Sequence, residues 1–271
     1  MLTDLGTAAG DQLGRRGAAV SMLRPIYSRW LRTAYGRHGV PWHVNGEPIR
    51  IDPDARHLVP HDNELALFQF LRDQIAPGDV VFDIGAFLGV YPIMEARWTG
   101  DRGRVFAFEP SPGSFALLQR HAEMNGLPPA RLTATCAAIG ARAEHRELIA
   151  FDGEPYRNML GSAVEGDATD FVEVLTVDDV AAATGRMPDW IRMDVQGLEF
   201  EVLRGASHVL RTRGRDLRIV AEMHPDQWPE YGVDPRDAAE QFAALGLRAR
   251  SLVPGEPTFV QGAHAILEPL T

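Results

Sequence analysis

Hydrophobic positions along the chain follow two alternating patterns, short continuous runs and helical spacing. Continuous apolar runs predict five strands buried on both faces, at residues 80–84, 104–108, 132–138, 190–195 and 217–223. Apolar residues three and four positions apart predict helices, at residues 64–75, from 85 to about 98, 114–125, 200–210 and 237–245. This alternation predicts an α/β fold built on a doubly wound, mostly parallel sheet.

Two pairs of segments fall outside the parallel pattern. The apolar runs at 247–253 and 259–267 predict a pair of antiparallel strands that closes the sheet. The segments 147–151 and 172–175 predict a hairpin or flap around the polar loop 152–170. We therefore expect one parallel sheet with a closing antiparallel pair and a separate β-flap.

The N-terminal part has a different pattern. Leu23 to Ala34 places apolar residues at helical spacing among arginines, which predicts an amphipathic helix. Prolines and glycines follow, so we expect an N-terminal helical extension over 1–57 and the main domain over 58–271. The apolar stripe favours packing against the main domain or a second subunit, which makes a homo-oligomer possible. An anionic membrane or an acidic partner is the alternative for the arginine-rich face.

Composition excludes several classes of protein. The chain has 271 residues and a formal net charge of −10, which argues against general nucleic-acid binding. No uncharged run approaches the roughly 20 residues of a membrane-spanning helix, and no signal-peptide pattern begins the chain. Cys136 is the single cysteine, so neither an intramolecular disulfide nor a thiolate zinc site is expected. We expect a cytoplasmic enzyme.

Candidate chemistry lies at the ends of the predicted strands, where open α/β sheets bind ligands. Gly85 and Gly89 follow the first strand, and Glu109 follows the second. An acid about 20 residues beyond a glycine turn can accept both hydroxyls of a nucleoside ribose. Phe87 replaces the second glycine of a dinucleotide fingerprint, and Asp83 would repel a pyrophosphate. A cofactor with an amino group and no phosphates, S-adenosylmethionine, fits these residues better.

A second candidate site follows the later strands. Asp194 and Glu199 lie at the end of the fourth strand, and Glu222 and His224 at the end of the fifth. We expect Asp194, Glu222 and His224 to be catalytic on the acceptor side, with His224 as the general base because neutral imidazole is available near pH 7. The alternatives are structural: His224 capping a loop and Asp194 capping the next helix.

Four motifs in order resemble the FkbM family of S-adenosylmethionine-dependent methyltransferases: Phe82–Gly89, Phe106–Pro110, Asp194–Gly205 and Ala221–Pro225. The resemblance extends to Ala138–Gly140 and Val174–Asp179 and covers about residues 62 to 225. It implies a Rossmann-like class I methyltransferase domain that methylates hydroxyl groups of secondary metabolites or sugars.

The resemblance also implies roles for individual residues. Asp83, Gly85 and Gly89 would line the methionine end of the cofactor, Glu109 would hold the ribose, and Ala137 with Ala138 would border the adenine. The full set of expected cofactor-binding residues is Asp83, Gly85, Ala86, Phe87, Gly89, Glu109, Pro110, Ala137, Ala138 and Asp194. Two positions depart from the family pattern: Phe87 stands where Asn is common, and Gln196 where Glu is common.

The leading hypothesis is therefore an O-methyltransferase that acts on a small-molecule hydroxyl. An N-methyltransferase, a nicotinamide-dependent oxidoreductase and a non-catalytic relative are the alternatives. A metal-assisted reaction with Mg²⁺ on Asp194, Glu222 and His224 is possible but not favoured, because the spacing shows no complete ligand set. No residue is assigned to a metal on sequence alone.

Overall fold

The computed structural model describes residues 30–150, 158–160 and 168–270. The chain divides into two compact units, Met1–His61 and Asp62–Thr271. The division falls four residues after the boundary expected near residue 57. Each unit has its own secondary structure and is described by itself.

The first unit contains a β-hairpin that the sequence patterns did not predict. Strands β1 (Val40–Val44) and β2 (Glu47–Ile51) pair in antiparallel register across a two-residue turn, Asn45–Gly46. Both turn residues have positive φ, 50° and 85°, as the tightest hairpin turns require. Residues 30–35 are helical, and most of the helix expected from Leu23 to Ala34 lies outside the described residues. Short 3₁₀ turns η1 (Gly36–His38) and η2 (Arg56–Leu58) flank the hairpin.

The second unit contains the predicted doubly wound sheet. Seven strands have the order β12-β13-β11-β10-β3-β4-β5. Their bounds are β3 Val80–Ile84, β4 Arg104–Phe108, β5 Leu132–Thr135, β10 Trp190–Met193, β11 Arg218–Met223, β12 Leu247–Ser251 and β13 Ala263–Pro269. The strands from β11 to β5 are mutually parallel, while β13 is antiparallel to both β11 and β12. The fold class predicted from the sequence is confirmed.

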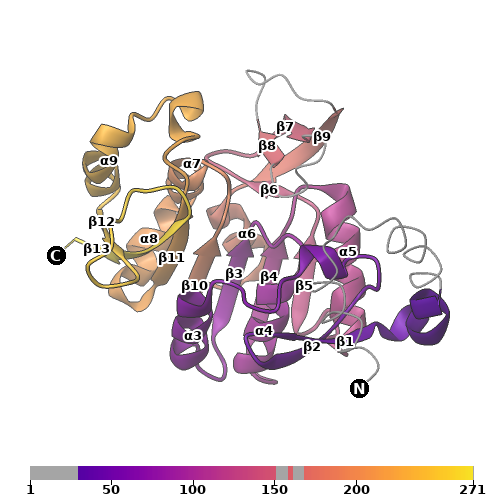
Figure 1. The fold of residues 1–271 in the computed structure, drawn as a ribbon. Helices are drawn as coiled ribbons and strands as arrows, with labels where there is room; N and C mark the ends of the chain where they lie inside the picture. The colour runs from indigo at the N-terminus through magenta and orange to yellow at the C-terminus, as the bar shows by residue number, and fades with distance from the viewer. Residues whose placement is uncertain (1–29, 151–157, 161–167, 271) are drawn as a thin grey trace. The chain divides into compact units, whose positions relative to one another are not determined.

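Helices connect the strands of the sheet (Figure 1). They are α3 Leu65–Gln74, α4 Val90–Trp98, α5 Pro112–Met124, α6 Val177–Thr184, α7 Glu199–Arg204, α8 Ser207–Arg213 and α9 Ala238–Ala244, with short 3₁₀ turns η3 Gly214–Asp216, η4 Trp228–Tyr231 and η5 Pro235–Asp237. Helix α6 was not predicted, although Thr176 gives it a good start: its hydroxyl accepts a hydrogen bond from the Asp179 N–H at 2.9 Å. The helix predicted over 200–210 is two helices, α7 and α8.

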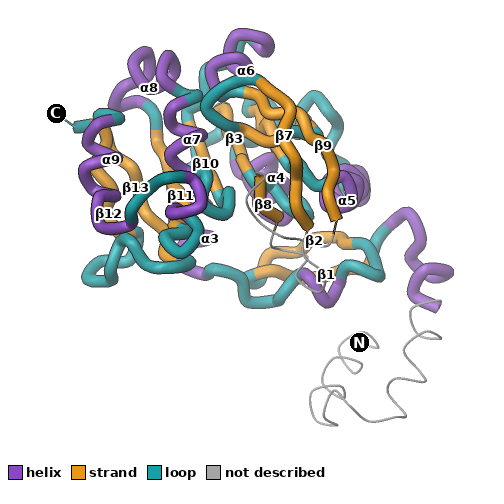
Figure 2. The backbone as a smooth tube through the Cα atoms, turned by 90° about the horizontal axis from the view of Figure 1, so that it is seen from above, coloured by secondary structure: helices purple, strands orange, loops and turns teal. Residues whose placement is uncertain are grey.

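A second, four-stranded sheet forms the predicted flap, seen above the main sheet in Figure 1 and beside it from above in Figure 2. It has the order β6-β9-β7-β8, with β6 Ala138–Ile139, β7 Glu144–Ala150, β8 Asn158–Leu160 and β9 Ala168–Leu175. The third strand predicted as one run, 132–138, is therefore divided between two sheets, because the chain leaves the main sheet after β5 and pairs with β9.

The core is a continuous apolar cluster around the main sheet. Phe82, Ile191 and Phe200 are at most 2% exposed, and Trp228 and Phe242 are fully buried beside them. Burying side chains of this size contributes about 1.5 to 3 kcal/mol each. Across the described ranges, no helix is long and apolar enough to cross a membrane.

A close backbone approach joins the flap to the helical layer at Gly205, the last residue of the longest family motif. A Cβ atom there would lie 2.0 Å from the carbonyl oxygen of Gly140. The Gly205 carbonyl also accepts a hydrogen bond from the Asp178 N–H at 3.0 Å. Gly140 and Gly205 are therefore in backbone contact, next to the segments by which the chain enters and leaves the flap.

We expect Gly205→Ala to lower the free energy of unfolding by about 2 kcal/mol or more, because two backbone segments must separate to admit the methyl group. Gly113→Ala is the matched control. Gly113 lies in the first turn of α5 with open space around it, so alanine should leave stability unchanged or raise it by up to about 1 kcal/mol. Urea unfolding followed by circular dichroism measures both variants, and equal midpoints would contradict the packing argument.

Candidate active site

The candidate site lies where the sheet changes winding direction. The chain builds β3, β4 and β5 outward on one side, then returns to place β10 and β11 on the other side of β3. Gly85 and Asp194 are the first residues beyond β3 and β10. A Cβ on Gly85 would lie 1.8 Å from the Asp194 carbonyl oxygen, and Gly85 has φ +83°. Glycine is required here by the approach of two strand ends.

Glu109 follows β4 and is held by two backbone amides. The Phe87 N–H donates to its Oε2 at 2.8 Å, and the Ser111 N–H donates to its Oε1 at 2.9 Å. Burial raises the pKa of Glu109 to about 7, although both N–H donors act in the opposite direction. The two amides fix the orientation of the carboxyl group, which is 4% exposed.

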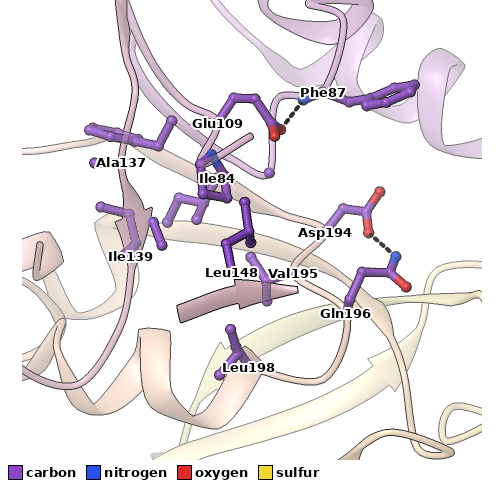
Figure 3. Close-up of a pocket in the computed structure, with 14 residues that line it drawn as sticks. Ile84, Phe87, Glu109, Ala137, Ile139, Leu148, Asp194, Val195, Gln196 and Leu198 are labelled. Atoms are coloured by element: carbon purple, nitrogen blue, oxygen red, sulfur yellow. Dashed lines mark hydrogen bonds between the residues drawn. The ribbon is translucent and has the colours of Figure 1, made fainter. Parts of the chain in front are cut away.

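A cavity opens beside Glu109 (Figure 3). Its empty volume is about 730 Å³, including the solvent at its mouth. The residues that line it are Ile84, Gly85, Phe87, Phe108, Glu109, Pro110, Ala137, Ala138, Ile139, Leu148, Asp194, Val195, Gln196 and Leu198. Seven of the ten residues expected to bind a cofactor are among them: Gly85, Phe87, Glu109, Pro110, Ala137, Ala138 and Asp194.

The walls of the cavity differ in polarity. Ile139, Leu148, Val195 and Leu198 form an apolar wall, while the Asp194 and Gln196 side chains lie apart from it (Figure 3). Leu148 belongs to strand β7 of the flap, and nothing in its own segment of sequence indicates a binding role. The apolar wall was therefore missed, because it forms only when the flap folds over the carboxyl ends of the strands.

Three expected cofactor-binding residues do not line the cavity. Ala86 is 5% exposed within the turn after β3, and Gly89 precedes α4 with its N–H bonded to the Ala86 carbonyl. Asp83 is fully buried in β3, and both its oxygens accept hydrogen bonds from Arg192 at 3.3 Å. In this structure Asp83 lies beneath the first loop rather than at the cavity wall.

Asp83 belongs to a buried cluster of charges. The guanidinium of Arg192 also stacks 4.0 Å above the ring of Tyr91. Burial raises the pKa values of Asp83 and Glu95, the charge of Asp83 raises that of Glu95 further, and the charge of Arg192 acts in the opposite direction on both. Within the described part of the chain, neither Glu95 oxygen has a hydrogen-bond partner. Burial thus favours the protonated carboxyls in this interior, and the positive charge of Arg192 favours their ionised forms.

The three expected catalytic residues come together at the ends of β10 and β11. The Nε2 atom of His224 lies 3.5 Å from Asp194 Oδ1 and 3.7 Å from Glu222 Oε1. On its other side, Nδ1 lies 2.7 Å from Glu199 Oε1, and Glu199 also accepts a hydrogen bond from the Trp228 indole at 2.7 Å. Glu199 therefore fixes the orientation of the His224 ring.

The charge state of His224 changes the role expected for it. Burial disfavours its charge, but the hydrogen bond and charge of Glu199, with Asp194 and Glu222, outweigh burial and raise the pKa of His224 to about 9. A pKa of about 9 favours the charged imidazolium of His224 at pH 7, and this form cannot accept a proton. The neutral His224 on which its expected role as general base depends is therefore populated mainly at higher pH. Burial and the Asp194 charge likewise raise the pKa of Glu222 to about 8.

The two departures from the family pattern share a backbone feature. Phe87 has φ +46° and Gln196 has φ +51°, a left-handed conformation that costs most residues energy and that Asn tolerates better. The Gln196 amide donates to Asp194 Oδ1 at 3.2 Å and lies 3.0 Å from His224 Nε2. Gln196 thus connects the cavity with the acceptor-side cluster, which consists of Asp194, Glu222 and His224, without adding another carboxylate.

Solved structures of methyltransferases resemble the chain. One, titled methyltransferase FkbM from Methylobacillus flagellatus, is 18% identical with a TM-score of 0.46, and the match covers 70% of this chain but only 43% of that one. Another, a SAM-dependent O-methyltransferase from Thermotoga maritima, is 15% identical with a TM-score of 0.45, covering 75% of this chain and 64% of that one.

Sequence comparison gives the family. A curated hexuronic acid methyltransferase from Haloferax volcanii is 24% identical over 185 residues, 68% of this chain and 70% of the relative. The family model described as the methyltransferase FkbM domain matches residues 83–248, which include the cavity and the acceptor-side cluster. The chain belongs to the FkbM methyltransferase family.

Proposed function

We propose that the chain is an S-adenosylmethionine-dependent O-methyltransferase that acts on a hydroxyl group of a small molecule, with a sugar as the leading acceptor class. One observation carries the proposal: the cavity and the acceptor-side cluster share Asp194. A methyl donor in the cavity and a hydroxyl at His224 would then meet at one strand end. Family membership sets aside the nicotinamide-dependent oxidoreductase that the sequence left open.

The polarity of the cavity residues suits the three parts of S-adenosylmethionine: adenine, ribose and the methionine ammonium group. The apolar wall with Ala137 and Ala138 suits an adenine ring, Glu109 has lone pairs left for ribose hydroxyls, and Asp194 offers a negative charge to an ammonium group. When bound, the cofactor supplies an electrophilic methyl group on a sulfonium.

The acceptor-side residues provide positioning and proton transfer. At neutral pH the charged His224 would donate a hydrogen bond to an acceptor oxygen, while Glu199 keeps the ring in place. As pH rises towards 9, neutral His224 becomes available as a proton acceptor. Because His224, Glu222 and Asp194 interact closely, the proton belongs to the cluster rather than to one residue.

Two observations support a sugar as the acceptor class. The Haloferax volcanii relative is named for a hexuronic acid, an oxidised sugar. The acceptor side of this chain offers several hydrogen-bonding groups, from Asp194, Gln196, Glu222 and His224, as recognition of a polyhydroxylated molecule requires. An amine acceptor would need little base catalysis, so the cluster favours oxygen over nitrogen.

The proposal is tested with purified protein and a panel of neutral and oxidised sugars. We expect S-adenosylmethionine or S-adenosylhomocysteine to co-purify with the protein or to bind in calorimetry. With ¹³C-methyl donor, a new methoxy signal should appear in the NMR spectrum of at least one sugar. Saturable cofactor binding with methylation only of amines would replace the O-methyltransferase assignment, and an absence of cofactor binding would remove both.

The Glu109 carboxyl gives a prediction for cofactor affinity. Glu109→Ala should weaken S-adenosylhomocysteine binding by about 1.5 to 3 kcal/mol, the usual cost of charge-assisted hydrogen bonds. Glu109→Gln should not restore the affinity, because its NH₂ group would face one of the two backbone N–H donors at Phe87 and Ser111. Calorimetric titration measures both variants, and affinity within twofold of wild type would rule out ribose binding by Glu109.

The same carboxyl predicts a pH dependence of binding. Its pKa of about 7 means that the ionised form, which accepts ribose hydroxyls more strongly, is populated as pH rises. Wild-type affinity for S-adenosylhomocysteine should rise up to about tenfold between pH 6 and pH 8, as expected for one titrating group. Glu109→Gln lacks this group and should bind with the same affinity at both pH values; an equal pH dependence in the variant would assign the titration elsewhere.

His224 gives a prediction for turnover. If neutral His224 takes the hydroxyl proton, kcat should rise with pH from 7, reach half its maximum near pH 9 and level off above it. His224→Ala should lower kcat by roughly 100-fold and remove this rise, with little change in S-adenosylhomocysteine affinity. The pH profile of kcat in both proteins measures the effect. A variant that retains the wild-type rise would show that another group accepts the proton.

A further inference from the structure

Three side chains with metal-ligating atoms gather on the acceptor side: Glu222, which belongs to the expected catalytic set, and Glu64 and His264, which do not. Glu64 precedes α3, Glu222 lies in β11, and His264 lies in β13 directly opposite Glu222 in the strand register. The His264 Nε2 atom is 3.0 Å from Glu64 Oε1 and 3.8 Å from Glu222 Oε2. One ligand atom from each residue lies within 4.8 Å of the others.

Hydrogen bonding leaves polar atoms at this cluster unsatisfied. The His264 Nε2 atom is buried and, among the residues that the structure describes, makes no hydrogen bond, although it approaches Glu64 closely. The hydroxyl of Tyr91, a residue 5% exposed, is also buried without a hydrogen-bond partner in the described segments. Burial raises the pKa of Tyr91, and the charge of the nearby Glu64 raises it further. Buried polar atoms of native proteins normally have partners.

The spacing of the atoms suits a bound ion. Ligand atoms held about 2.0 to 2.2 Å from a metal lie about 3.0 to 3.5 Å apart. From His264 Nε2, the 3.0 Å separation to Glu64 lies at the lower end of this range and the 3.8 Å separation to Glu222 lies slightly above it. An imidazole with two carboxylates is a ligand set that manganese, zinc and related divalent ions accept.

Charge favours a cation at the same place. Glu64, Glu222 and Asp194 are neighbours in space, and Arg192 is the arginine whose charge acts on Glu64 and Glu222. The two oxygens of Glu222 face different partners: Oε1 is 3.7 Å from His224, and Oε2 is 3.8 Å from His264. A cation between Glu64, Glu222 and His264 would therefore lie beside the acceptor without displacing His224 from Glu199.

We propose that Glu64, Glu222 and His264 bind one divalent transition-metal cation, which adds a positive charge to the acceptor side of the site. The ion offsets the carboxylates that would repel an anionic acceptor oxygen. The site requires neither the methyl donor nor a sugar, so metal binding is measured independently of the proposed methyltransferase reaction.

The experiment titrates the metal-free full-length protein, prepared by chelator dialysis, with Mn²⁺ and counts free Mn²⁺ by electron paramagnetic resonance. We expect one bound ion per chain, and at least about tenfold weaker binding in Glu64→Gln and in His264→Gln, the order of loss known for weakened metal sites. Glu268→Gln is the matched control, since Glu268 is a β13 carboxylate that pairs with Arg248 and Arg250 away from the cluster. It should bind Mn²⁺ as the wild type does.

Asp194→Asn separates this site from the neighbouring cluster, which also has three ligand-type residues. Mn²⁺ binding that survives Asp194→Asn but not Glu64→Gln supports the proposal. Binding lost in Asp194→Asn and retained in Glu64→Gln would overturn it in favour of Asp194, Glu222 and His224, and no stoichiometric binding by wild type would also overturn it. Pulsed resonance of the wild-type complex, which should show imidazole nitrogen coupling, gives a test that does not depend on the folding of a variant; its absence would count against His264.

Discussion

The buried guanidinium of Arg192 is the constraint on which the rest of the site depends. It lies on β10 directly opposite Asp83 on β3, at the point where the sheet changes winding direction. The side chain is 6% exposed, and an unpaired charge at such a place would cost several kcal/mol. Asp83 pairs with it, Tyr91 stacks against it, and Asp194 lies 4.0 Å from its other nitrogen. One interior charge thus joins the two halves of the sheet to the floor of the candidate site.

Asp194 connects three parts of the site because of where β10 ends. Its backbone packs against Gly85, the residue lines the cavity, and Oδ1 faces His224. A methyl donor and an acceptor must meet within a few ångströms for direct transfer. A strand end that borders both places provides that proximity without a moving segment. The flap adds Leu148 to the other wall and so closes the cavity on its apolar side.

The site holds an excess of carboxyl groups, and their burial and mutual proximity shift its pKa values. Desolvation raises the pKa values of Asp83, Glu95, Glu109 and Glu222, and the carboxylates of Glu199, Asp194 and Glu222 raise that of His224. Glu64 is the exception, since His264 and Arg192 outweigh its burial and lower its pKa to about 2. Strongly shifted groups that cluster in one cleft are typical of functional sites. Any ligand that brings positive charge will change the protonation of several of these groups together.

The sequence by itself determined where the strands of the main sheet lie along the chain, their alternation with helices, and the residues at the strand ends. Continuous apolar runs report burial on both faces, and an open parallel sheet brings its carboxyl ends to one edge. For that reason Glu109, Asp194, Glu222 and His224 could be chosen before the fold was known. The hairpin at Asn45–Gly46 also had a readable signal, but the neighbouring prolines hid it.

Only the tertiary structure decided which of these residues reach the cavity and what charge they carry. Asp83 has the sequence context of a cofactor ligand, yet Arg192 holds it inside the sheet. The pKa of His224 is raised because Glu199, Asp194 and Glu222 surround it. Glu64 and His264 reach Glu222 from elements about 158 and 42 residues away. Leu148 lines the cavity through the flap. Periodicity reports the local environment of a residue, whereas pKa values and ligand sets depend on groups that are distant along the chain and close in space.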